Sequence, residues 1–182
     1  MSDARKALLE RLFDEAARNG LADRSLRELA EAAGTSHRML LYHFGSRQGL
    51  VTAIVEAVES AQRELLMATA AEASSAAELV MSFWRQVSAD EMRPFVRLFF
   101  ECVATAGHES TGAWIEVSES VTDRLGLRFD PDEIRLGVAV TRGLLIDVLA
   151  TGDTGPATRS IERFIELLPA WQASRDDHRS RR

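Results

Sequence analysis

The stretch Gly34–Phe44, with the sequence GTSHRMLLYHF, combines side chains that can contact base edges with side chains that need a core. The guanidinium of Arg38 can donate two parallel hydrogen bonds to O6 and N7 of a guanine, and Met39 can lie against a thymine methyl group. Leu40 and Phe44 are one helical turn apart, which places them on the same face of a helix. The pattern predicts a helix with one buried face and one face offered to DNA.

A second short helix is predicted immediately before this stretch. Ser25 and Glu28 have the spacing of a capping box, in which the serine oxygen accepts from the Glu28 amide and the glutamate accepts from the Ser25 amide. Leu26 and Leu29 begin the inner apolar stripe of this helix. Gly34 is expected to end it after about two and a half turns.

The helix that carries Arg38 is bounded by similar signals. Either Thr35 or Ser36 caps its first turn, it runs to about His43, and Gly45 breaks it. Residues 25–44 are therefore predicted to fold as a helix, a glycine-containing turn and a second helix. This is the helix-turn-helix signature, in which the second helix enters the DNA major groove.

Other polar residues around the two helices extend the predicted contact surface. Arg27 can reach a phosphate or a guanine edge, and the amides around Ser25 can hold a phosphate. Tyr42 and His43 can contact phosphate or sugar, and Arg47 can add a phosphate contact. The predicted DNA-contacting residues are Ser25, Arg27, Ser36, His37, Arg38, Met39, Tyr42, His43 and Arg47.

The whole chain is predicted to be all-α. Of its 182 residues only four are proline and eleven are glycine, whereas helix-forming alanine, leucine, glutamate and arginine are plentiful. We expect about nine helices and no strand. Besides the two already described, helices are expected over residues 4–19, 46–73, from 75 onward, 90–107, 110–125, 130–150 and 154–171. The expected organisation is a DNA-binding domain over residues 1–46, a second helical domain over 47–173 and a disordered tail over 174–182.

Charge and cysteine usage narrow the class of protein. The net charge is −6, which argues against general coating of nucleic acid. Residues 1–50 hold eight Lys/Arg and seven Asp/Glu, so the first domain alone is close to neutral and can carry a local basic face. A single cysteine, Cys102, excludes an internal disulfide and favours a reducing cytosol. Neither a signal peptide nor a membrane span is expected, so we predict a soluble cytoplasmic protein.

At residues 8–58 the chain resembles the TetR family of bacterial transcriptional regulators. The segment SLRELAEAAGTSHRMLLYHFGSRQGLVTAIVEAV contains a serine that opens the second helix, an "LA..AG" run before the turn and an aromatic "YHF" that closes the recognition helix. A "GSR" cap then leads into a long fourth helix. About 130 further helical residues follow, which fits the length of such regulators.

Two positions differ from the family pattern. The family often has a small residue or proline where Arg38 stands, so the operator sequence cannot be taken from a relative. It usually has a tyrosine where Leu41 stands, and that tyrosine typically contacts phosphate. Here the hydroxyl is shifted to Tyr42, and a shift of one residue rotates a helical side chain by about 100°.

The resemblance implies that residues 47–173 form a ligand-sensing and dimerisation domain with a cavity between helices. Candidate lining residues are aromatic or polarisable groups on the middle helices, although stripes of this kind also occur as ordinary core. They are Phe83, Trp84, Phe95, Phe99, Phe100, Cys102, Val103 and Trp114.

Residues 134–150 are apolar around much of the helix circumference, with Gly137 and Gly143 permitting close approach. Such a helix needs cover on two sides, from its own chain alone or from a partner as well. Family members dimerise through their last helices in a four-helix bundle, which implies a homodimer here. Candidate interface residues are Val140, Leu144, Val148, Ile161, Phe164, Ile165 and Leu168.

Together these features predict a homodimeric repressor that binds a near-palindromic double-stranded operator and is released by a small-molecule effector. An activator or a ligand-independent regulator of the same fold is the alternative. A helical small-molecule-binding protein or enzyme whose head no longer binds DNA is a third possibility. No catalytic motif is present, and His108 has no neighbour at metal-ligand spacing. We therefore expect no enzymatic activity, metal or cofactor, and no membrane partner.

Overall fold

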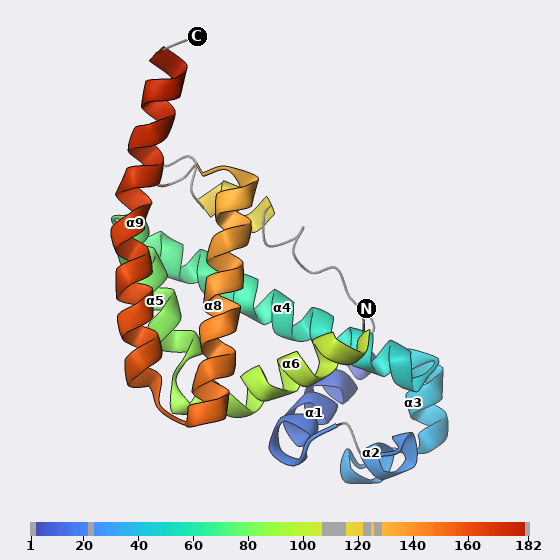
Figure 1. The fold of residues 1–182 in the computed structure, drawn as a ribbon. Helices are drawn as coiled ribbons and strands as arrows, with labels where there is room; N and C mark the ends of the chain where they lie inside the picture. The colour runs from blue at the N-terminus through green and yellow to red at the C-terminus, as the bar shows by residue number, and fades with distance from the viewer. Residues whose placement is uncertain (1–2, 22–23, 107–115, 122–124, 126–128, 181–182) are drawn as a thin grey trace. The chain divides into compact units, whose positions relative to one another are not determined.

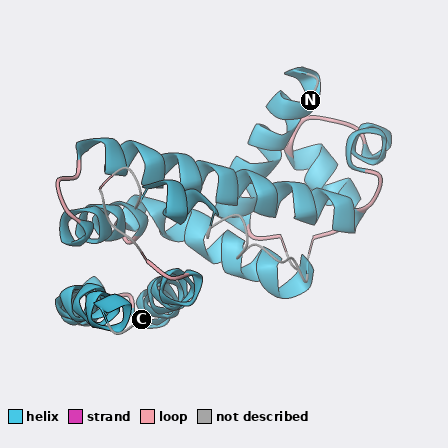
Figure 2. Cartoon of the chain, turned by 90° about the horizontal axis from the view of Figure 1, so that it is seen from above, coloured by secondary structure: helices cyan, strands magenta, loops and turns pink. Residues whose placement is uncertain are grey.

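The computed structural model describes residues 3–21, 24–106, 116–121, 125 and 129–180, with the backbone alone for 104–106 and 169–180. All regular structure in these residues is helical (Figure 2). The predicted all-α fold is therefore confirmed. None of the described helices combines the length and apolar character that crossing a membrane requires.

The N-terminal part contains the helix-turn-helix arrangement that the caps predicted. Its helices are α1 (Asp3–Asn19), α2 (Leu26–Ala32), α3 (His37–Phe44) and the long α4 (Arg47–Glu72) (Figure 1). Ser25 caps α2 in a capping box with Glu28, and Ser36, not Thr35, caps α3. Gly34, in the turn between α2 and α3, has a φ of 64°, a left-handed conformation that favours glycine.

The remaining helices follow the predicted order. They are α5 (Ala76–Val87), a short 3₁₀ turn η1 (Asp90–Met92), α6 (Arg93–Ala106), a helical stretch at 116–121, α8 (Pro131–Thr151) and α9 (Thr154–Ser180). Asp130 caps α8 and forms a capping box with Glu133, and Pro131 lies in the first turn of this helix. Much of the helix expected over 110–125 falls outside the described residues.

Two boundaries differ from the expectation. Asp90 opens the 3₁₀ turn η1, and α6 starts only at Arg93. The helix α9 continues to Ser180, whereas we expected it to end near Trp171 and the tail 174–182 to be disordered. No glycine or proline follows Trp171 in the sequence, so no strong helix breaker stands in this segment.

The chain divides into two compact units. The first, the head, comprises residues 1–61 and 91–108, and the second comprises 62–90 and 109–182. The head extends beyond the boundary expected at residue 46, because the first half of α4 and most of α6 belong to its core. Buried side chains from α4 and α6 in this core are Leu50, Val51, Ala53, Ile54, Val55, Val58, Leu98, Phe99 and Cys102.

The second unit has its own packing. Helix α9 packs against both α5 and α8, and α8 and α9 run side by side in Figure 1. Trp84 of α5 is buried and its indole Nε1 donates a hydrogen bond to Thr158 Oγ1 at 2.9 Å. A separate cluster of Leu66, Ala70, Leu79 and Val121 packs α4 against α5 and the 116–121 helix.

Candidate nucleic-acid interface

The recognition helix α3 is held down on one side and open on the other. Leu40 is 1% exposed and Phe44 is 8% exposed, so this pair fastens the helix to the head core. The Ser36 hydroxyl accepts from the Met39 amide at 3.2 Å and so satisfies one of the first-turn donors. The orientation of α3 is therefore fixed by its own cap and by two apolar anchors.

Arg5 of α1 holds the other end of α3, and the sequence reasoning did not identify it. Its Nε donates to the His43 carbonyl at 3.2 Å, and its guanidinium lies 5.1 Å from the centre of the Phe44 ring. A cation at the C-terminal end of a helix also interacts favourably with the helix dipole. Because 38 residues separate the two bonded groups, no local sequence pattern could indicate this contact.

The corner between α3 and α4 depends on a close approach at Gly49. A Cβ atom on Gly49 would overlap the carbonyl oxygen of Phe44, a backbone atom that cannot swing away. Ser46 stabilises the same corner, since its amide donates to the Phe44 carbonyl at 2.8 Å and its hydroxyl accepts from the Gly49 amide at 3.0 Å. The lack of a side chain at Gly49 thus sets how closely α4 can follow α3.

The expected phosphate site at the start of α2 is already used within the chain. The Glu28 carboxylate accepts from both the amide and the hydroxyl of Ser25, each at 2.7 Å. These hydrogen bonds hold the pKa of the Glu28 carboxyl below its usual value. The Ser25 amide is therefore already bonded to the negatively charged Glu28 carboxylate. Ser25 serves as a helix cap in this structure.

Arg47, which was expected to contact phosphate, is half-buried inside the head. Its Nη2 donates to the Leu21 carbonyl at 2.8 Å, while the Leu21 amide donates to the Glu101 carboxylate of α6 at 3.1 Å. Both backbone groups of buried Leu21 are thus bonded to charged side chains from other helices. This geometry gives Arg47 a role in fixing the link between α1 and α2.

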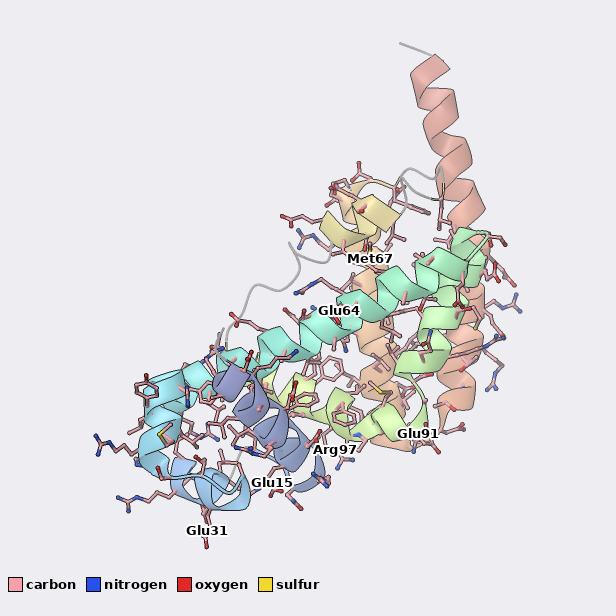
Figure 3. The ribbon with its side chains drawn as sticks, turned by 180° about the vertical axis from the view of Figure 1, so that it is seen from behind. Glu15, Glu31, Glu64, Met67, Glu91 and Arg97 are labelled. Atoms are coloured by element: carbon pink, nitrogen blue, oxygen red, sulfur yellow. The ribbon has the colours of Figure 1, made fainter. Side chains whose placement is uncertain are left out.

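The predicted contact residues therefore fall into two groups. His37 and His43 are half-buried, as is Arg47, and the His43 ring lies edge-on to Tyr42 with centroids 5.0 Å apart. The exposed members of the predicted set are Ser25, Arg27, Ser36, Arg38, Met39 and Tyr42. Exposed acidic groups also lie on the head, among them Glu31 of α2, which projects outward in Figure 3.

The predicted ligand-lining residues divide between the two units. In the head, Phe99 and Cys102 are buried in the core, and Phe95 stacks on Phe13 with centroids 5.1 Å apart. Phe100 and Val103 pack against the same core. Burial, together with the nearby Glu101 carboxylate, raises the pKa of the Cys102 thiol to about 12, as expected for an unreactive side chain.

In the second unit, Trp84 is buried and Phe83 packs against the cluster around Leu66. Trp114 lies outside the described residues. Each described candidate thus has a packing role within its own unit. Among the described residues, no group of three or more His, Cys, Asp or Glu side chains is arranged to hold a metal ion.

The predicted dimer residues are largely covered by their own chain. Val148, Ile161, Phe164 and Leu168 are buried, and Val140, Leu144 and Ile165 are half-buried. Among the described residues of these helices, the large apolar side chains that are exposed are instead Leu136 and Ile146 of α8 and Leu167 of α9, which are 47%, 52% and 52% exposed. The sequence indicated an apolar helix but did not reveal which face its own chain covers.

Comparison with known proteins agrees with this geometry. Residues 8–54 match the family model of the bacterial regulatory proteins of the tetR family. Residues 8–54 form a TetR-type helix-turn-helix domain. The match covers α2, α3 and their turn, together with most of α1 and the start of α4. No curated protein matches the chain.

Solved structures extend the likeness to the fold of the whole chain. A TetR-family regulator from Pectobacterium atrosepticum has a TM-score of 0.74 at 20% identity, covering 93% of this chain and 94% of the other. A transcriptional regulator from Rhodococcus sp. has a TM-score of 0.67 at 17% identity, covering 91% and 95%. The multidrug binding protein EbrR in complex with ethidium has a TM-score of 0.67 at 22% identity, covering 88% and 97%. The chain therefore has the fold of TetR-family transcriptional regulators.

Proposed function

We propose that this protein is a homodimeric transcriptional repressor that binds a near-palindromic operator through α3 and is released by a small-molecule effector. The observation that carries the proposal is the open face of α3. Arg38, Met39 and Tyr42 are exposed there, while Leu40 and Phe44 on the opposite side are buried. An exposed arginine on a rigidly held recognition helix suits hydrogen bonding to guanine in the major groove.

The exposed face of α8 supports the dimer. Leu136, Ala139, Gly143, Ile146 and Ala150 are all exposed and recur at spacings of three and four residues, so they form one apolar stripe. Gly143 has no heavy atom within 4 Å of a Cβ position, so a second helix could approach closely there. A self-complementary stripe of this kind suits a two-fold interface, and two heads related by a dyad would bind two inverted half-sites.

The course of α4 supports control by an effector. This single helix belongs to the head from Arg47 to Ala61 and to the second unit from Gln62 to Glu72. A ligand bound among the candidate aromatic residues would therefore shift α4. In the proposed dimer this shift changes the separation of the two α3 helices. EbrR, which shares the fold, is described in complexes with imidazole and ethidium.

Selection of bound duplexes from a random DNA pool tests the proposed function. We expect recovery of one sequence family with two inverted half-sites, and binding that weakens steeply with salt because several phosphates are contacted. The enriched duplex then serves to screen compounds that lower its affinity. By linkage, the DNA must weaken the binding of such a compound by the same factor. A pool that shows no enrichment over several rounds would contradict DNA-binding specificity.

A further inference from the structure

The open face of α3 is unusually apolar for an exposed surface. Three of the seven large hydrophobic side chains that are exposed in the described part of the chain lie on this eight-residue helix. Met39 is 40% exposed, Leu41 is 38% exposed and Tyr42 is 78% exposed. Scattered exposed apolar side chains are ordinary, whereas a local concentration of them marks a contact surface. Arg38 supplies the charge in the middle of this surface.

Tyr42 stands at the centre of the open face. It lies two residues from both Leu40 and Phe44, which turns it about 200° away from each of these buried anchors. It also follows Arg38 by one helical turn, so the two side chains form one row along the helix. The edge-on contact with His43 supports the Tyr42 ring from the side.

The row formed by Arg38 and Tyr42 matches the chemistry of the major groove. Four residues advance about 6 Å along a helix axis, close to two base-pair steps of about 3.4 Å. Tyr42 therefore reaches bases about two steps from the guanine that Arg38 binds. The 5-methyl group of thymine is the apolar group that bases present in the major groove. We propose that Tyr42 packs its ring against a thymine methyl group within about two base pairs of the guanine bound by Arg38. The inference rests on the proposed function and adds a second specificity-determining residue to it.

The test uses the duplex that the wild-type protein enriches from random DNA. Each thymine in one half-site is replaced singly by deoxyuridine, which removes only the methyl group, and the dissociation constant is measured for wild type, Tyr42→Phe and Tyr42→Ala. At one thymine near the guanine we expect roughly fourfold weaker binding by wild type and by Tyr42→Phe. Tyr42→Ala should bind the unmodified duplex at least as weakly as wild type binds the deoxyuridine duplex. Replacing the same thymine by deoxyuridine should then weaken the binding of Tyr42→Ala no further. Leu41→Ala is the matched control and should keep the deoxyuridine effect at the same thymine.

Three results would overturn the inference. Tyr42→Phe could lose as much affinity as Tyr42→Ala, which would assign the contact to the hydroxyl and a phosphate. The deoxyuridine effect could persist in Tyr42→Ala, or no thymine near the guanine could be sensitive. Because Tyr42 is the single tyrosine of the chain, labelling with 3-fluorotyrosine gives one ¹⁹F resonance, which should shift differently with the thymine and deoxyuridine duplexes. If the proposed function itself fails, no duplex is enriched from the random DNA pool. That result is distinct from the three above and also excludes this inference.

Discussion

Gly49→Ala should destabilise the head and abolish sequence-specific DNA binding. An alanine Cβ would overlap the Phe44 carbonyl oxygen, so α3 and α4 must move apart before the variant can fold. Overpacking of this kind costs about 1–3 kcal/mol, and in a chain of this length a loss of that size lowers the melting temperature by about 2–12 °C. Because α3 ends at this corner, its tilt in the groove changes even in molecules that remain folded.

Gly49→Ala is expected to lower the stability of the protein, which is the opposite of the usual effect of replacing glycine by alanine in a helix. In an ordinary helical position, replacing glycine by alanine stabilises by about 0.5–1 kcal/mol. Gly137→Ala in α8 is the matched control, because a Cβ there would meet the Phe164 ring at an ordinary 3.7 Å. Thermal unfolding followed by circular dichroism should show opposite shifts for the two variants. A Gly49→Ala protein as stable as wild type would mean that the α3–α4 corner is looser than described.

In the proposed dimer, Ile146→Glu should separate the two copies into monomers and weaken operator binding at least 100-fold. Ile146 is 52% exposed within one chain and belongs to the apolar stripe on α8. A carboxylate there would be buried without a partner when two copies meet, which is strongly unfavourable. The loss on DNA follows because two linked heads gain a factor of about 10²–10⁴ over one head.

The control for Ile146→Glu is Ala77→Glu, which adds the same charge at an exposed position in the first turn of α5. An acidic residue is well tolerated at a helix N-terminus. Sedimentation at micromolar concentration should give a dimer for wild type and for Ala77→Glu, and a monomer for Ile146→Glu. A dimeric Ile146→Glu protein would place the interface elsewhere.

The parts of the fold that sequence could predict are those with local causes. The capping box at Ser25 joins residues three apart, and Asp130 followed by Pro131 is a local signal for a helix start, so both starts were visible in the sequence and are present in the structure. The buried face of α3 followed from the spacing of Leu40 and Phe44. These features need no knowledge of the rest of the chain.

The parts that sequence could not predict depend on distant segments. The bond from Arg47 to Leu21 spans 26 residues, and an arginine alone does not show whether it meets a carbonyl or a phosphate. Gly49 reads as an unremarkable helical residue until the position of the Phe44 carbonyl is known. The interface candidates on α8 and α9 had the same limitation, because an apolar pattern does not show which side Ile161 and Phe164 pack against.

Base recognition by α3 requires that Arg38 contributes more on the operator than on other DNA, and a comparison of affinities measures this difference. The affinities of wild type, Arg38→Ala and Arg97→Ala are compared on the enriched duplex and on a scrambled duplex of equal length and composition. Arg97 is the matched control, an exposed arginine on α6 (Figure 3). Arg38→Ala should lose about 1–3 kcal/mol on the enriched duplex and little on the scrambled one, while Arg97→Ala binds both like wild type. Equal losses on the two duplexes, or no loss on either, would contradict base recognition by α3.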